Sequence, residues 1–450
     1  ADVTMIRSYY GSRGYADVAI NPDIRDAGPN RVHIKYLITE GSRYRVGRVN
    51  IEGNTKTKDK VIRREIPLKP GDWFNSVELD TTKARLDNLQ YFSDVQTSGS
   101  PGGSGYRDVN VLVEEKATGS VGVGLGFSSI DSVVGFLNLE QSNFDLFNPW
   151  SFTGGGQRFA MNLRLGSERT DFSVSLVEPW FMDRQLALGG ELFYRQSTYF
   201  SDYYEQTNAG GAVSLRKPIG NRSSLKLEYR LEQVEIDLES DTPAGSALQQ
   251  DEGDYLRSAL ALNYVYDSRD STILPRSGHK IDAGLTVAGL GGDVETFTLS
   301  VQGQKYWNLK WDTILSVNGE LAFVDSWGDD VPVFERMFLG GGRTLRGFEF
   351  RDVGPRDNPG TTDEVIGGQS LGFISLEYTI PIVETVRAAV FYDTGFVNAD
   401  SWDPSPSDLY SDVGVGIRLK LPTSPLPLAL DYAIPVSSPD DEADKGGQFN

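Results

Sequence analysis

Few residues of this sequence could perform catalysis or hold a metal ion. Cysteine is absent, and only two histidines occur, His33 and His279. His33 lies in a strand-like segment and His279 in a Gly/Pro turn, and neither has a serine and an acid nearby in a pattern that suggests a catalytic triad. Histidine-rich and thiolate metal sites lack ligands here. We therefore expect no catalytic residue, no metal and no cofactor.

One arginine stands in a segment that suggests a specific contact. The stretch FERMFLGGGRTLRGFEFRDVGPRD, which contains Arg346, lies in a region of little hydrophobic periodicity, about 324–370. Loops longer than about 15 residues without structure of their own are usually functional or disordered. Gly340–Gly342 permit a close backbone approach, and Gly347 frees the turn beside Arg346. By itself an R-G-F triplet is weak, because a solvated loop arginine would look the same.

Two carboxylates follow in segments with the alternation of β-strands. The apolar side chains of residues 374–380 fall on one face, which leaves Glu377 on the other. The same holds for residues 388–393, where Ala388, Val390 and Tyr392 leave Asp393 on the opposite face. The pattern alone fits a hydrated carboxylate equally well.

Composition limits the class of protein. Only 39% of the 450 residues are hydrophobic, and no segment supplies the roughly 18 consecutive apolar residues of a membrane helix. The chain is therefore a soluble globular protein or a β-barrel, which hides its lipid contact in alternation. Its net charge of −20 argues against nucleic acid as a partner.

Residues 1–116 contain the only convincing amphipathic helices. A strand at 45–51, helices at 57–66 and 75–92, and strands at 93–97 and 107–114 give a small α+β domain over 42–116. The first 41 residues repeat the second half of this pattern, with a helix ending near Gly14 and strands at 15–20 and 31–38. We interpret residues 1–41 as the C-terminal half of the same kind of domain.

From about residue 117 to 450, period-two alternation recurs between turn residues. In 225–231, for example, Leu, Leu, Tyr and Leu alternate with Lys, Glu and Arg. A β-sandwich would have to bury the charged face, which costs too much. A barrel hydrates it in the lumen while the apolar face meets lipid. The prediction is a mainly β chain with an antiparallel transmembrane barrel of about 16 strands.

The motif and several other segments resemble the BamA-type family, outer-membrane barrels that carry periplasmic POTRA domains. Leu345-Arg346-Gly347-Phe348 is similar to the family's (V/I)RGF motif, with Leu in the first position. Further similarity lies at 177–194, 267–281, 366–380 and 387–396, and residues 45–115 resemble the POTRA domain next to the barrel. The resemblance implies that the loop folds into the lumen, where Arg346 meets Glu377 and Asp393.

The resemblance also implies a function. POTRA domains in the periplasm would receive unfolded outer-membrane proteins, with periplasmic chaperones and the accessory lipoproteins of an assembly complex as partners. The barrel, surrounded by outer-membrane lipid, would insert these clients through a lateral seam between its first and last strands. Gly122, Gly124 and Gly126 in the first strand and Phe449 in the last would form this seam, since glycine weakens a strand. Small residues that let the inward loop pack are an equally good reading of these glycines.

Three other functions are weighed against the insertase. A polypeptide transporter of the same superfamily, of the two-partner secretion or TamA type, would pass a partner through the lumen. A diffusion porin is disfavoured by the POTRA-like modules, and an outer-membrane enzyme by the lack of catalytic residues. The number of POTRA domains would separate these possibilities. We expect a mature fragment whose natural start is missing, and we expect GGQFN to begin the terminal strand.

Overall fold

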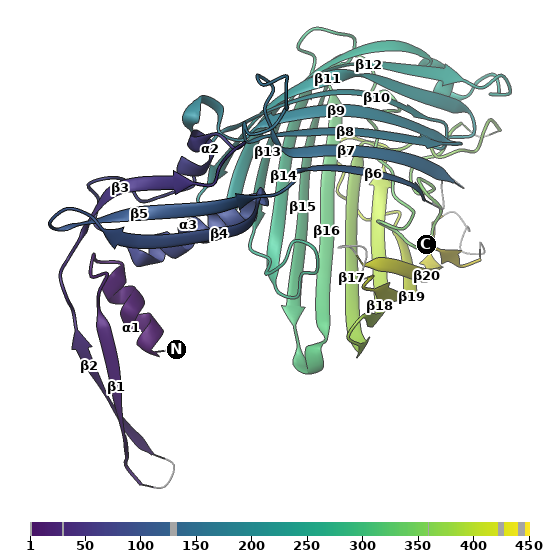
Figure 1. The fold of residues 1–450 in the computed structure, drawn as a ribbon. Coiled ribbons are helices and arrows are strands. Elements are labelled where there is room, and N and C mark those ends of the chain that lie inside the picture. The colour runs from purple at the N-terminus through teal and green to yellow at the C-terminus, as the bar shows by residue number, and fades with distance from the viewer. Residues whose placement is uncertain (1, 29–30, 127–132, 359, 422–426, 440–445) are drawn as a thin grey trace. The chain divides into compact units, whose positions relative to one another are not determined.

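The computed structural model describes residues 2–28, 31–126, 133–358, 360–421, 427–439 and 446–450 (Figure 1). Its contacts divide the chain into two compact units. The first comprises residues 1–121, 139–160 and 176–179, and the second comprises 122–138, 161–175 and 180–450. No helix in the described part of the chain is long and apolar enough to span a membrane.

The N-terminal segment consists of helix α1 (Asp2–Gly11) and an antiparallel pair of strands, β1 (Ala19–Asp26) and β2 (Val32–Thr39). The predicted strand at 15–20 is wrong in its position. Residues 15–18 form a turn after Gly14, whose φ of +97° favours glycine. Strand β1 then runs through polar residues, because backbone pairing with β2 from Ala19↔Thr39 to Asp26↔Val32 extends it beyond the apolar pattern.

The α+β domain contains strand β3 (Arg45–Glu52), helices α2 (Asp59–Arg63) and α3 (Ser76–Leu89), and strands β4 (Phe92–Pro101) and β5 (Tyr106–Glu115). The sheet order is β3-β5-β4, with β5 parallel to β3 and antiparallel to β4. The helices and the sheet share one core, whose most deeply buried members are Val46, Val61, Ile62, Leu86, Val95, Val109 and Val111. The predicted order of elements matches this domain.

Both helices of this domain are shorter than the sequence pattern indicates. Helix α2 begins at Asp59, not at 57, because the Thr57 amide donates to the Glu115 carboxylate and Lys58 is extended. Helix α3 begins after Asn75, whose side chain accepts from the amides of the second and third helical residues. It ends at Gln90, which adopts a left-handed conformation with φ of 61°.

A glycine turn at 154–156 packs against the backbone that leads into helix α2, within the same compact unit. The Lys58 amide donates to the Gly154 carbonyl at 2.9 Å, and a Cβ at Gly154 would lie 2.1 Å from the Lys56 carbonyl oxygen. Buried Asn143 joins the two segments, since it donates to Thr57 Oγ1 at 2.9 Å and accepts from the Gly156 amide at 2.9 Å. Only a residue without a side chain fits at this contact.

The remaining strands form one 16-stranded sheet in sequence order, β6 to β21. Every neighbouring pair from β10 to β21 is antiparallel. The strands are β6 (Gly119–Gly126), β7 (Val134–Phe144), β8 (Gln157–Gly166), β9 (Arg169–Glu178), β10 (Ala187–Ser197), β11 (Tyr204–Ile219), β12 (Ser223–Leu238), β13 (Gly253–Asp267), β14 (Gly278–Ala288), β15 (Thr296–Asn308), β16 (Ile314–Ser326), β17 (Ser370–Val383), β18 (Val386–Asn398), β19 (Tyr410–Leu419), β20 (Leu428–Ser437) and β21 (Gln448–Phe449). Short 3₁₀ helices occur at Phe181–Asp183, Ala247–Gln250 and Lys310–Asp312.

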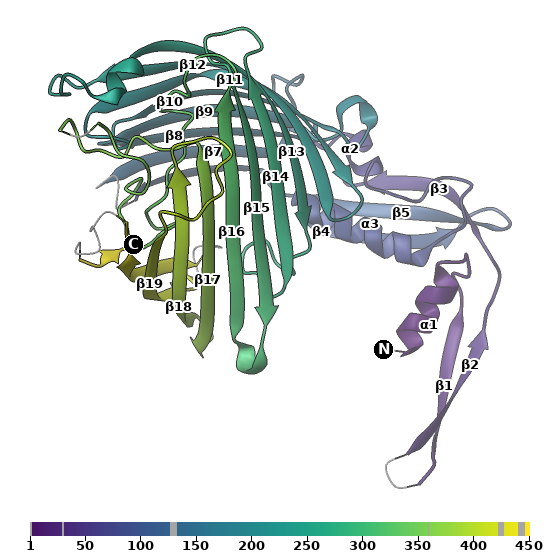
Figure 2. The same cartoon turned by 180° about the vertical axis from the view of Figure 1, so that it is seen from behind.

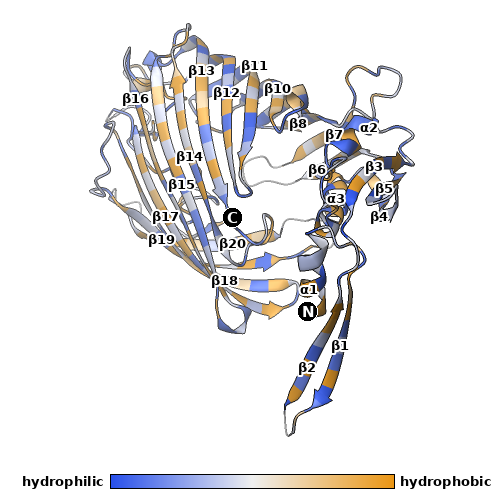
Figure 3. Ribbon diagram, turned by 90° about the vertical axis from the view of Figure 1, so that its left-hand side faces the viewer, coloured by the Kyte–Doolittle hydropathy of each residue, from blue (hydrophilic) through white to orange (hydrophobic). Residues whose placement is uncertain are grey.

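The predicted fold class, a 16-stranded antiparallel barrel after an α+β domain, is confirmed. Strands β13 to β19 run side by side (Figure 2), and hydrophobic and hydrophilic residues alternate along them (Figure 3). In β12, for example, Leu227, Tyr229 and Leu231 are exposed on one face, as expected for a lipid-facing surface. The segment between β16 and β17, residues 327–369, is called the long loop below.

Candidate functional site

The motif of the long loop lies against the buried face of strands β17 to β20. Leu345 is fully buried and belongs to a cluster with Leu339, Val353 and residues of the wall. Phe348 packs edge-on against Tyr410 at the start of β19, with ring centroids 5.6 Å apart. These apolar contacts flank Arg346 and fix the loop backbone, so the guanidinium group is presented to the wall in one orientation.

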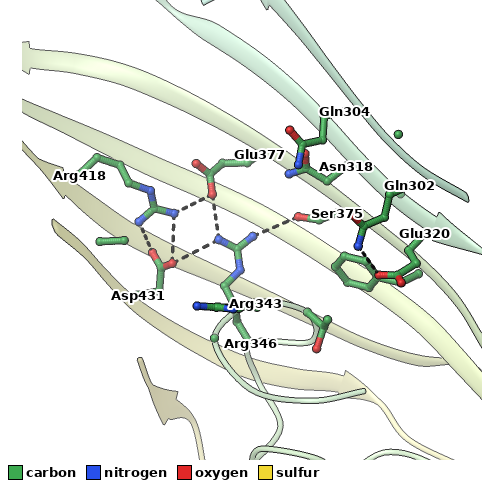
Figure 4. A pocket seen from close by; sticks show the side chains of 16 residues that line it. Gln302, Gln304, Asn318, Glu320, Arg343, Arg346, Ser375, Glu377, Arg418 and Asp431 are labelled. Atoms are coloured by element: carbon green, nitrogen blue, oxygen red, sulfur yellow. Dashed lines mark hydrogen bonds and ion pairs between the residues drawn. The ribbon is translucent and has the colours of Figure 1, made fainter. Parts of the chain in front are cut away.

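Arg346 contacts three carboxylates and a hydroxyl. Its Nε and Nη2 donate to the two oxygens of Asp393 at 2.7 and 2.9 Å, a bidentate pair. Its Nη1 donates to Glu377 at 2.8 Å and to Asp431 at 3.3 Å, and Nη2 donates to Ser375 at 3.2 Å. Figure 4 shows the guanidinium group between Glu377 and Asp431. The structure thus brings together the three residues that the sequence singled out, and adds Asp431.

A second arginine, Arg418 of β19, contacts two of the same acids. Its Nη2 donates to Glu377 Oε2 at 2.7 Å, and its two terminal nitrogens both donate to Asp431. Asp412 completes the cluster from β19 by accepting the Gly347 amide at 2.9 Å. Four carboxylates therefore surround two guanidinium groups, and we call these six side chains the anchor cluster: Arg346, Glu377, Asp393, Asp412, Arg418 and Asp431.

The position after Arg346 must be glycine for steric reasons. A Cβ at Gly347 would lie 2.6 Å from the Cβ of Asp412 and 3.1 Å from the backbone of β20 at Ile434. Any side chain would push the loop away from the wall and lengthen the bond from its amide to Asp412. The motif residues thus have separate tasks: charge pairing by Arg346, close approach at Gly347, and packing by Leu345 and Phe348.

Sequence reasoning missed Asp412, Arg418 and Asp431, although a signal for them exists. In β19, Val413, Val415 and Ile417 are exposed to the outside, which turns Asp412 and Arg418 inward. In β20 the exposed Tyr432 and Ile434 likewise leave Asp431 on the buried face. The alternation that indicated Glu377 and Asp393 therefore applies to these residues as well.

The glycines of β6 differ in what surrounds them. A Cβ at Gly124 would lie 2.5 Å from the ring of Phe136 on β7, so this position has no room for a side chain. At Gly122 and Gly126 the nearest atoms are 4.0 Å away, an ordinary contact distance. Glycine at these two positions is therefore not explained by space. At Gly124 the residue is small because a neighbour packs closely on it, but that neighbour is Phe136 and not the long loop.

Strand β21 pairs with β20 over two residues, and the adjacent Asn450 exchanges backbone hydrogen bonds with Asp431 at 2.8 and 2.9 Å. Phe449 lies opposite Tyr432 and Gln448 opposite Ala433, and the Phe449 side chain is exposed. The strand order ends at β6 on one side and β21 on the other, and within the described ranges no ladder joins these two strands. The amide of the Asn450 side chain donates to the Arg346 carbonyl at 2.8 Å. The last residues of the chain thus contact the motif directly.

Neither histidine has a catalytic arrangement in the described residues. His33 lies in β2 opposite Arg25. His279 Nδ1 lies 3.1 Å from Ser268 Oγ, but this hydroxyl also donates to the His279 carbonyl at 3.0 Å, and the ring stacks on Tyr266. The serine proton is therefore used in a local contact between β13 and β14. Among the described residues, no group of three or more His, Cys, Asp or Glu side chains could hold a metal ion.

A 16-stranded barrel that follows an α+β domain and is contacted by an Arg-Gly-Phe loop defines the class of POTRA-bearing outer-membrane barrels. Residues 151–450 match the Omp85 superfamily domain, and residues 44–116 match the POTRA family, described as a surface antigen variable number repeat. The chain belongs to the Omp85 superfamily. It is a barrel of the outer membrane, with its POTRA domain in the periplasm.

The comparisons place this chain near the BamA branch. It is similar to the outer membrane protein assembly factor BamA of Nitratidesulfovibrio vulgaris, with 29% identity over 463 residues that cover 100% of this chain and 56% of the relative. BamA from Haemophilus ducreyi lacking POTRA domains 1–3 has a TM-score of 0.78 and 21% identity, covering 99% of this chain and 90% of that one. The resemblance drawn from the sequence is confirmed.

Another solved structure fits less well. CdiB from Escherichia coli has a TM-score of 0.59 and 16% identity, covering 98% of this chain and 80% of that chain. Because the sequence identities of these two structures are only 21% and 16%, their similarity to this chain shows a shared fold alone. The chain spans about half the length of the curated relatives it matches, 56%, 52% and 54% in three cases.

Proposed function

We propose that this chain is the barrel-bearing part of an assembly factor that inserts unfolded outer-membrane proteins into the outer membrane. The observation that carries the proposal is similarity along 100% of the chain to a protein named an outer membrane protein assembly factor. The anchor cluster supports it, because the arginine and the glycine amide of that family's Arg-Gly-Phe motif are bound here by carboxylates of the wall. The function needs no catalytic residue and no cofactor.

The POTRA domain offers edges to which an extended client could add. In the order β3-β5-β4, strands β3 and β4 are the edges of the sheet. Strand addition would supply main-chain hydrogen bonds without demanding a particular client sequence, as an insertase with many clients requires. Periplasmic chaperones and accessory lipoproteins are the further partners that we propose, together with outer-membrane lipid.

Insertion then proceeds at the lateral seam between β6 and β21. An unpaired backbone group in lipid costs several kcal/mol, so barrel strands are normally paired along their length. Two features support a weak seam: the glycines of β6, and the short pairing of β21 with β20 at the other end of the strand order. Gly122, Gly124, Gly126 and Phe449 are the seam residues of the proposal.

The test is a reconstitution of the chain in vesicles of outer-membrane lipid, with an unfolded barrel protein as client. We expect the client to fold faster than in empty vesicles, as followed by its heat-modifiable migration. A transporter of the two-partner secretion type would leave client folding unchanged and would show ion conductance through the lumen once the long loop is released. That outcome would overturn the insertase proposal.

A further inference from the structure

The long loop carries a second enclosed arginine, five residues beyond Arg346. The guanidinium carbon of Arg351 lies 3.6 Å from the ring centroid of Phe338 and 4.8 Å from that of Phe200. Its Nε is shielded from solvent and has no hydrogen-bond partner in the described structure. Arg351 has a φ of 60°, a left-handed conformation that a residue with a side chain rarely adopts. From this backbone the guanidinium group lies within cation–π distance of both rings.

Phe200 belongs to a different part of the wall from the anchor cluster. It lies in the segment between β10 and β11, where its ring is tilted against Tyr199 and stacked on Phe350. It packs on the cluster that contains buried Tyr204, Val234 and Ile236. Long-loop residues Val333, Phe334, Phe338 and Ile366 complete that cluster, which we call the β11–β12 cluster.

The same loop therefore contributes to two separate apolar clusters. Leu339, Leu345, Phe348 and Val353 pack with β17 to β19, in what we call the β17–β19 cluster, whereas Phe338 and its neighbours pack with β11 and β12. Arg346 is the cationic contact of the first side, and Arg351 that of the second. Tyr204 and Glu364 also interact with the Arg351 guanidinium group, while aromatic faces replace part of the hydration that its unpaired Nε loses. Arginine suits such a place because it is weakly hydrated and its plane stacks on rings.

We propose that Arg351 is a second anchor, which holds the long loop against β11 and β12 independently of the contact between Arg346 and β17 to β20. Arg351 is a positioning residue: it acts by fixing the loop that carries the motif. The loop then spans two parts of the wall and limits their movement relative to each other. Its relevance to client insertion rests on the proposed function, but the anchoring does not.

The absence of cysteine in the chain permits a direct test with single reporters. The reporters are Val234→Cys and Val397→Cys, one in each variant. Val234 is fully buried in β12 within the β11–β12 cluster, and Val397 is buried in β18 within the β17–β19 cluster. Each variant of the full chain is folded into lipid vesicles, and the rate of maleimide labelling reports how often the loop leaves that side. Folding is verified by heat-modifiable migration.

Arg351→Met should raise labelling of V234C about fivefold to thirtyfold, the range that an enclosed cation–π contact implies, and that of V397C less than twofold. Arg346→Met should do the reverse. Arg343→Met is the matched control, because Arg343 lies in the same loop with an exposed side chain, and it should change neither rate. Phe200→Leu should reproduce the effect of Arg351→Met on V234C and reduce any further effect of that substitution.

If Arg351→Met increased the labelling rates of both reporters equally, the loop would be held as one unit. If it increased neither labelling rate, the aromatic contact would not hold the loop. Either result overturns the second anchor. If Arg351→Met does not fold, Arg351→Lys, which keeps the charge and loses the planar stacking, replaces it with the same expected pattern at smaller size. Because no client is present, failure of client insertion in vesicles would reject the insertase proposal and leave this result intact.

Discussion

Arg346 and Arg418 share a single oxygen atom: Oε2 of Glu377 accepts from Nη1 of the first at 2.8 Å and from Nη2 of the second at 2.7 Å. Both guanidinium groups also contact Asp431. One arginine belongs to the long loop and the other to the wall, so the loop is held through acids that the wall has already oriented. Within the described part of the chain, Arg418 forms no hydrogen bond with the long loop. It therefore affects the loop through Glu377 and Asp431, which it orients.

The first prediction concerns this shared arrangement. Arg418→Met should weaken loop anchoring by about 2 kcal/mol, since Glu377 loses one charged hydrogen bond and Asp431 loses two. A double-mutant cycle with Arg346→Met, followed by loop proteolysis in the folded barrel, should show coupling of about 1 kcal/mol or more. Arg387→Met serves as control, because Arg387 contacts Thr379 and Asp312 instead. Additive effects of the first pair would contradict the arrangement.

Reversal of the loop charge should be more damaging than its removal. Arg346→Glu would place a fifth carboxylate among four, with Arg418 as the remaining cation of the cluster. Removal of one partner from a buried ion pair costs about 3–5 kcal/mol. The loss of stability caused by Arg346→Glu should exceed the loss caused by Arg346→Ala. Thermal unfolding in detergent and growth of cells that depend on the variant are the measurements. Strictly additive effects of Arg346→Ala and Asp393→Ala on stability would show that their 2.7 Å contact does not contribute.

The outer part of the long loop should respond to pH through Asp357. Burial raises the pKa of this carboxyl, but hydrogen bonds from Ser246, the Ala247 amide, Thr362 and the Asn358 amide outweigh it, and the pKa lies below the usual 3.8. Because the pKa is lower in the folded protein, ionised Asp357 stabilises the fold at pH values above its ordinary pKa. This stabilisation is lost as the pH falls through the pKa of the folded state. Exchange protection of the Ala247 amide should therefore decrease in acid.

The comparison for this prediction is Asp357→Asn, which cannot ionise. Its Ala247 amide should exchange faster than that of the wild type at neutral pH, and the two should converge as the pH drops below 3.8. A constant difference between the two proteins across the whole pH range would show that ionisation of Asp357 plays no part.

A disulfide across the seam should stop client insertion. Leu125 and Phe449 are both exposed residues of the first and last barrel strands. A disulfide requires Cα atoms within about 7 Å, so a cysteine pair at these positions, or at neighbours chosen to face each other, forms only when the seam closes. We expect the oxidised L125C/F449C protein to lose client insertion and to regain it with reductant. Insertion at the normal rate by the cross-linked barrel would remove lateral opening from the mechanism.

Replacement of both histidines should have no effect on function. The ring of His279 contacts Ser268 and Tyr266, and His33 lies in a strand at a distance in sequence from every residue of the anchor cluster. His33→Gln with His279→Gln should leave client assembly unchanged in cells that depend on the variant. Loss of assembly by a normally folded double variant would reopen the question of catalysis.

Alternation predicted the faces of Glu377 and Asp393, because a strand that meets lipid on one side reveals its inner residues by period alone. What alternation cannot supply is register. Asp393 lies directly opposite Asp412, and the cation beside this pair of acids, Arg346, arrives from a loop distant in sequence. Arg351 illustrates the same limit, since Phe200 is far from it along the chain and no local pattern joins them.

The glycine turn at 154–156 gives the POTRA domain a stiff connection to the ends of β7 and β8. The contact is made by main-chain atoms at Lys58 and Gly154, reinforced by buried Asn143. Main-chain atoms in direct contact have no side-chain rotamers that could change to absorb a displacement. A displacement of the domain is therefore transmitted directly to these strand ends. These strand ends belong to the same compact unit as the domain, and β7 is the neighbour of the glycine-containing strand β6 in the sheet. A force applied in the periplasm would thus be delivered beside the first strand of the barrel.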